Sequence, residues 1–79
     1  MNREEFDRRL ASIERRLGGG LGEAAPTRDS LDAAYAELVE LAREPSNQED
    51  RVRRRAVAAV GEMLERTFAA LGMAAPDRR

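Results

Sequence analysis

Arginine is the residue whose number and spacing first suggest chemistry in this sequence. Four arginines stand within five positions, and this basic run consists of Arg51, Arg53, Arg54 and Arg55. A guanidinium stays charged at physiological pH and binds carboxylates or phosphates through two N–H donors. On a helix Arg51, Arg54 and Arg55 project from the polar side, whereas Arg53 falls on the apolar side. The run therefore predicts a salt-bridge network within the chain, a contact with an acidic protein, or a contact with a phosphate backbone.

Acidic residues gather on the polar face of the preceding predicted helix. This acidic face consists of Asp29, Asp32, Glu37, Glu40 and Glu44. Few basic residues on the same helix can neutralise it, and its last acids lie where the helix dipole disfavours anions. We therefore expect the acidic face to bind a partner protein rich in arginine or lysine. The two charged surfaces together predict a partner-binding set of Asp32, Glu37, Glu40, Glu44, Arg51, Arg54 and Arg55.

The residue types that most catalysis requires are missing from the chain. The 79 residues include no histidine and no cysteine, and all 14 basic residues are arginine. The usual general base, the thiolate nucleophile and the commonest metal ligand are therefore lacking. Ser12, Ser30 and Ser46 have no histidine or lysine to activate them. We expect no enzymatic activity, no metal site and no bound cofactor.

One short motif points to a different function. Asp29-Ser30-Leu31-Asp32 resembles the D-S-L motif of acyl carrier proteins, whose serine carries phosphopantetheine at the start of an acidic helix. The resemblance covers four residues, and the chain length and the acidic helix after the motif are similar too. It implies that Ser30 is the attachment site and that Glu37 and Glu40 lie on the partner-facing side. Asp and Ser before an apolar run also mark an ordinary helix start.

The spacing of apolar residues predicts helices throughout a single domain, residues 1–79. Asn2 is a good cap for the first helix, and a capping box of Ser46 and Glu49 is the predicted start of the last one. Pro45 ends the helix before it. The expected elements are helices at about 3–17, 29–44 and 47–71, a flexible linker at 18–26 and a frayed tail at 73–79.

The last predicted helix has the widest apolar arc. An arc approaching half of a helix is more than one neighbouring helix covers. A chain of 79 residues is also short for independent folding. We therefore expect an all-α three-helix bundle, a helical hairpin plus a long C-terminal helix, that homodimerisation completes. The expected dimer interface consists of Val60, Met63, Leu64, Phe68 and Leu71.

Charge and hydropathy narrow the class of function. The net charge of −1 argues against nucleic acid or a membrane as the dominant partner. No apolar stretch approaches the about 18 residues of a membrane span or forms an N-terminal targeting segment, so we expect a cytoplasmic protein. The favoured function is a non-enzymatic protein-binding module: an adaptor, a regulator, or an inhibitor of a larger complex such as a phage-encoded anti-CRISPR. The alternatives are a nucleic-acid-associated regulator using Arg51–Arg55 and an acyl-carrier-like protein using Ser30.

Overall fold

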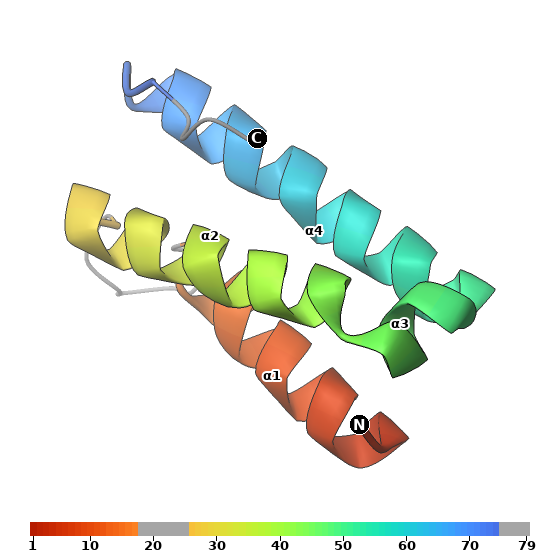
Figure 1. Cartoon of the computed structure of the whole chain (residues 1–79). Helices are drawn as coiled ribbons and strands as arrows, with labels where there is room; N and C mark the ends of the chain where they lie inside the picture. The colour runs from red at the N-terminus through yellow and green to blue at the C-terminus, as the bar shows by residue number, and fades with distance from the viewer. Residues whose placement is uncertain (18–25, 75–79) are drawn as a thin grey trace.

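The computed structural model describes residues 1–17 and 26–74, and the regular structure of these residues is entirely helical. The described helices are α1 (Arg3–Arg15), α2 (Arg28–Arg43), α3 (Pro45–Glu49) and α4 (Arg51–Ala70). Helices α1, α2 and α4 pack against one another with alternating chain direction, and the short α3 connects α2 to α4 (Figure 1). The prediction of an all-α bundle is confirmed. Most of the predicted linker (18–26) and tail (73–79) lies outside the described residues.

Side-chain caps determine where α1 and α2 begin. The Asn2 Oδ1 atom accepts a hydrogen bond from the Glu5 amide at 2.7 Å, as the sequence predicted. At α2 the cap is Thr27, whose Oγ1 accepts a hydrogen bond from the Ser30 amide at 3.1 Å. Each cap satisfies an amide that has no partner within its helix. Helix α2 consequently begins at Arg28, one residue before the predicted start.

The predicted helix at 47–71 is in fact two helices separated by Asp50. The backbone at Asp50 is extended, with φ −95° and ψ 112°, and this interrupts the helical path between α3 and α4. The Oδ1 atom of Asp50 accepts hydrogen bonds from the amides of Val52 at 2.9 Å and Arg53 at 3.1 Å. A carboxylate cap at this point also offsets the positive end of the helix dipole. Asp50 therefore starts the long helix.

The capping box predicted at Ser46 and Glu49 is wrong. Pro45 occupies the first position of α3, which suits proline because the amide there has no partner within the helix. Ser46 lies inside this five-residue helix, and its Oγ atom accepts a hydrogen bond from the Met1 amino group at 3.0 Å. Ser46 and Asp50 are both residue types that can cap a helix start. In the structure the cap is Asp50, and the helix that begins there packs against α1 and α2.

One apolar core fills the space between α1, α2 and α4. Its buried side chains are Phe6, Leu10, Ile13, Leu31, Ala34, Leu38, Leu41, Val60, Leu64 and Phe68. These residues come from the apolar faces of the three helices. Val52, in the first turn of α4, is 64% exposed, whereas the neighbouring Arg53 lies inward, as its place on the apolar side predicted.

Asn47 is a buried polar residue at the end of this core. Its Nδ2 atom donates a hydrogen bond to the Leu41 carbonyl at 2.9 Å, and its Oδ1 atom accepts one from Arg53 Nη1 at 3.0 Å. Leu41 lies in the last turn of α2, where carbonyls have no partner within the helix. Asn47 thus joins the end of α2 to the start of α4. Sequence reasoning missed this role because nothing in the local pattern distinguishes Asn47 from an exposed residue.

Candidate protein-binding surface

The acidic face of α2 packs beside the arginines of α1. Arg16 Nη1 lies 2.8 Å from Glu37 Oε1, and Arg9 Nη2 lies 3.4 Å from Glu40 Oε2. Arg9 lies in α1 and Arg16 caps its C-terminal end, so both pairs join this part of the chain to α2, which is far away in the sequence. The predicted docking acids Glu37 and Glu40 are therefore already paired within the chain, which the pattern of α2 alone did not reveal.

Two of the three remaining acids on this face are paired too, while Asp29 forms no ion pair with the described residues. Asp32 Oδ2 lies 3.6 Å from Arg28 Nε, one helical turn away, and Glu44 Oε1 lies 3.8 Å from the Met1 amino group. The sequence predicted few basic neighbours for the acidic face on its own helix, and the structure supplies further ones from outside that helix. Its charge is balanced from α1, from the first turn of α2 and from the start of the chain. The acidic face consequently offers a partner much less free charge than the sequence suggested.

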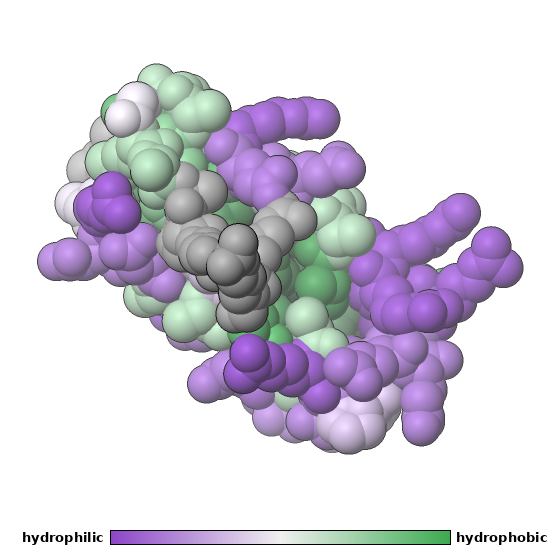
Figure 2. All heavy atoms as spheres, turned by 45° about the horizontal axis from the view of Figure 1, so that its top comes forward, coloured by the Kyte–Doolittle hydropathy of each residue, from purple (hydrophilic) through white to green (hydrophobic). Residues whose placement is uncertain are grey.

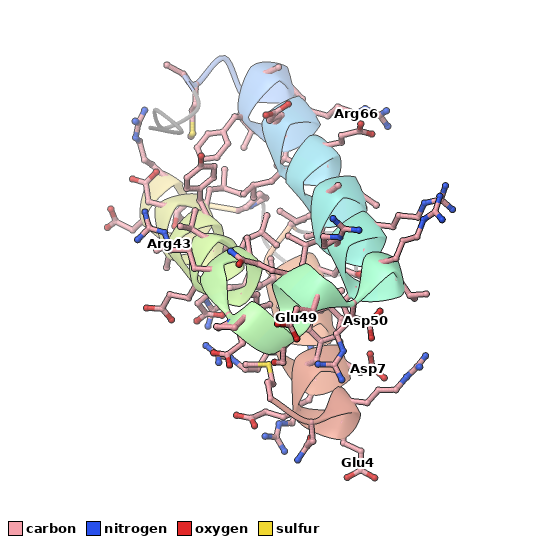
Figure 3. All side chains as sticks on the ribbon, turned by 45° about the vertical axis from the view of Figure 1, so that its right-hand side comes forward. Glu4, Asp7, Arg43, Glu49, Asp50 and Arg66 are labelled. Carbon is pink, nitrogen blue, oxygen red and sulfur yellow. The ribbon has the colours of Figure 1, made fainter. Side chains whose placement is uncertain are left out.

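Arg53 belongs to the interior of the bundle. Its Nη1 atom donates hydrogen bonds to the Met1 carbonyl at 2.9 Å and to Asn47 Oδ1 at 3.0 Å. Its guanidinium also lies 5.3 Å from the centre of the Phe6 ring, a cation–π geometry, and 3.5 Å from Asp50. Asp50 stands at the start of α4, across a small hollow from α1 (Figure 3). The intramolecular network predicted for the basic run thus involves this one arginine.

The other three arginines of the basic run point outward. Arg51, Arg54 and Arg55 are exposed, and among the described residues none of them forms an ion pair. Together with Ala58 they line a shallow hollow of about 270 Å³ on the outer side of α4. Long hydrophilic side chains extend from this end of the molecule in Figure 2. The structure therefore separates Arg53, which is used within the fold, from three arginines with unused donors.

An apolar groove of about 350 Å³ runs between α2 and α4 beside this hollow. Its floor and walls are formed by Tyr35, Leu38, Val39, Ala42, Val57, Ala58 and Gly61, and Glu62 and Glu65 lie along its α4 rim. Ala58 lines both the groove and the arginine hollow, so the two form one continuous surface. We name this the α4 surface. Sequence reasoning missed the groove because it depends on how far α2 and α4 stand apart.

The predicted dimer interface is split by the fold. Val60, Leu64 and Phe68 are 2%, 1% and 1% exposed, because α1 and α2 cover them within one chain. They are unavailable to a second subunit, so this part of the predicted interface is wrong. Met63 and Leu71 are 42% and 40% exposed. These two residues do not line the α4 surface, which lies on a different side of the helix.

Ser30, the residue implied by the carrier resemblance, lies in the first turn of α2. Its amide is bound by the Thr27 cap, and the side chain is half-buried. Glu37 and Glu40, which the resemblance places toward a partner, are instead bound by Arg16 and Arg9. The short α3 and then α4 follow α2 in the chain.

The described part of the chain contains neither a membrane-spanning helix nor a group of residues that could hold a metal ion. None of its helices has the length and apolar character needed to cross a membrane. Within these residues no three Asp or Glu side chains gather closely enough to hold a metal ion.

Comparison of the chain with protein-family models, curated proteins and solved structures found no match. Function must therefore be argued from the geometry of the surface itself.

Proposed function

We propose that this chain is a non-enzymatic protein-binding module that binds a helix of another protein chain on its α4 surface. The observation that carries the proposal is the contrast between the two charged faces. Four of the five acids of the acidic face form ion pairs within the chain, whereas Arg51, Arg54 and Arg55 are exposed without a carboxylate from the described residues. Adaptors, regulators and inhibitors of larger complexes all fit this description.

The energetics of the arginine cluster favour an external carboxylate. Arg51, Arg54 and Arg55 are spaced three and four residues apart, so that their charges repel on one side of the helix. Each such like-charge pair costs about 0.2–0.5 kcal/mol, which acidic side chains of a partner would reverse. The cluster lies within the first two turns of α4, where the helix dipole also disfavours positive charge. An acidic partner removes both costs.

The apolar groove adds the second element of a binding surface. Its lining is mostly small and aliphatic, with Tyr35 as the aromatic side chain. An amphipathic helix binds such a groove by burying its apolar face while its polar face stays in water. Charged residues at the rim then control the rate of encounter and the orientation of the bound helix. The groove and the arginine hollow together favour a helix whose acidic end lies over the arginines.

A paired set of charge reversals tests this proposal. The variant Arg54→Glu/Arg55→Glu changes the α4 surface, and Arg8→Glu/Arg15→Glu makes the same change in net charge on α1. Proteins captured from the native host by the wild-type chain should be lost, at least tenfold, by the first variant and kept by the second. Equal loss with both variants would show a nonspecific charge effect, and no loss with either would contradict the proposal.

A phosphate backbone is the second candidate for the same arginines. The hollow is lined by three guanidiniums and Ala58, with no aromatic side chain on which a base could stack. Protein is favoured over nucleic acid because the apolar groove adjoins the hollow. Fluorescence anisotropy with labelled duplex DNA and single-stranded RNA distinguishes the two. Binding that weakens steeply with salt and is lost in Arg54→Glu/Arg55→Glu would favour the nucleic acid.

The carrier hypothesis keeps one supporting observation, which is the position of Ser30 in the first turn of the acidic helix α2. Incubation with a phosphopantetheinyl transferase and coenzyme A tests it directly. Mass spectrometry of the wild type and of Ser30→Ala shows whether the prosthetic group is added to Ser30. We expect no addition, because the acids that would face a carrier's partner enzymes are bound by Arg9 and Arg16.

A further inference from the structure

One stripe of α4 carries charges of opposite sign on either side of a small residue. The stripe consists of Arg51, Arg54, Ala58, Glu62 and Glu65. Its spacings of three, four, four and three residues keep all five side chains on one side of a helix with 3.6 residues per turn. The same residues line the hollow and the α4 rim of the groove. The residues before and after Ala58 therefore lie at equal distances from it along the helix. Those before it are positively charged and those after it are negatively charged.

This pattern has a direct consequence for two copies of α4 that pack antiparallel. When a two-fold axis passes through Ala58, a residue that precedes Ala58 in one chain lies opposite the residue that follows Ala58 by the same number of positions in the other chain. Arg54 then faces Glu62 of the partner subunit, each about 6 Å along the helix from the axis at 1.5 Å per residue. By symmetry the pair occurs twice. Arg51 similarly comes opposite Glu65 of the partner subunit. The arginines of one chain thus meet the acids of the other.

The shape of the surface suits the same arrangement. Helices pack about 8–10 Å apart, and the closest approach needs small side chains at the crossing point. Ala58 at the axis and Gly61 beside it supply them, and both line the groove. A stable dimer buries about 800 Å² per subunit, more than the narrow stripe of one helix provides. The groove side of α2, with Val39 and Ala42, therefore has to contribute to the contact.

We infer that the helix bound by the α4 surface is α4 of a second copy of this chain, packed antiparallel about Ala58. The inference rests on the proposed function and names its partner. Glu62 is exposed and, among the described residues, forms no ion pair, so it is available to Arg54 of the partner subunit. Glu65 already has an interaction within its own chain, so the contact between Arg54 and Glu62 is the one that we expect to stabilise the dimer. This interface shares no residue with the one predicted from the apolar arc.

Two single charge reversals and their mixture test the inference by sedimentation equilibrium. Arg54→Glu alone places two carboxylates against each other in both halves of the interface, and Glu62→Arg alone brings two guanidiniums together. Each variant should dissociate at least tenfold more readily than the wild-type dimer. A one-to-one mixture places the two carboxylates of the first variant opposite the two guanidiniums of the second, so both halves of the interface hold opposite charges and the mixed dimer should form about as readily as the wild type. The double variant Arg54→Glu/Glu62→Arg restores opposite charges in both halves, so it should dimerise about as readily as the wild type. Both residues are exposed, and circular dichroism should show unchanged helix content.

The outcomes separate this inference from the proposed function. A wild-type chain that stays monomeric at about 100 µM overturns the inference, while loss of a host partner in Arg54→Glu/Arg55→Glu would still support the proposed function. A dimer that withstands both single reversals also overturns the inference, because the two-fold axis then lies elsewhere. Recovery of the dimer both in the one-to-one mixture and in the double variant supports it, because each restores opposite charges between positions 54 and 62 across the two-fold axis. The control variant Arg8→Glu should dimerise as the wild type does.

Discussion

Arg16, which caps the C-terminal end of α1, and Glu37 of α2 form a half-buried ion pair, with 2.8 Å between Nη1 and Oε1. The pair joins two helices that the sequence separates by 21 positions. The sequence predicted that the acidic residues of α2 bind a partner protein. In the structure Glu37 instead holds the end of α1 against α2. The acidic residues of α2 therefore contribute to the packing of the helices, and fewer of them are available to a partner protein.

Reversal of Glu37 should consequently destabilise the chain. Partly exposed ion pairs contribute up to about 1 kcal/mol, and Glu37→Arg replaces attraction with repulsion. We expect urea unfolding, followed by circular dichroism, to show a loss of about 1 kcal/mol. The double variant Arg16→Glu/Glu37→Arg should recover most of it. Glu14→Arg on the exposed side of α1 is the control, with a change within about 0.5 kcal/mol. Equal stability of Glu37→Arg and the control would contradict the structural role.

The arginines of the basic run should differ sharply in their effect on stability. Arg53→Ala removes hydrogen bonds to the Met1 carbonyl and Asn47 and leaves both groups short of a donor. We expect a loss of about 2–3 kcal/mol in the free energy of unfolding. Arg55→Ala removes an exposed side chain and should change stability by less than about 0.5 kcal/mol. Similar values for the two variants would mean that Arg53 is not part of the interior.

Asn47 should be the most sensitive polar position in the connection between α2 and α4. Asn47→Leu keeps a side chain of similar size but leaves the Leu41 carbonyl and one Arg53 donor without a partner. An unsatisfied buried group costs about 1–3 kcal/mol, so we expect a clear drop in the melting temperature. Gln48→Leu, at the exposed neighbouring position, provides the matched comparison and should leave the melting temperature nearly unchanged. A harmless Asn47→Leu would contradict this assignment.

Leu64 and Met63 are adjacent in the sequence and should behave oppositely. Leu64 is 1% exposed within one chain, so Leu64→Ala should cost about 2–5 kcal/mol through lost burial and the cavity left behind. Met63 is 42% exposed, and Met63→Ala should cost under about 1 kcal/mol. The difference should persist at low protein concentration. If the cost of Leu64→Ala appeared only at concentrations that support a dimer, Leu64 would belong to an interface instead.

Local patterns were sufficient to predict most of the helical structure. The Asn2 cap and the apolar spacing of α1 and α2 act within one or two helical turns, so they can be recognised without knowing the fold. The break at Asp50 was missed because Ser46 and Asp50 are both competent caps. Choosing between them requires knowing that α4 must turn back to pack on α2. The one-turn α3 follows from that choice.

The candidate site was predicted in part and for a similar reason. The basic run is visible in the sequence, and helical spacing placed Arg53 on the apolar side, but its partners Met1 and Asn47 could not be read from that spacing. Which charged residues remain available is decided by contacts such as Arg9 with Glu40, which lie 31 positions apart. No periodicity within a helix encodes such a contact. The apolar groove likewise depends on the separation of two helices.

Composition and helical periodicity therefore determine that this chain is all-α, lacks the residues of ordinary catalysis, and carries two opposite charge clusters. Those properties belong to single residues and to neighbours within a turn. The pairing of the α2 acids and the burial of Val60, Leu64 and Phe68 within one chain were decided by packing. Each depends on how one helix is rotated and placed against another, which is a property of the whole bundle and of no segment taken alone.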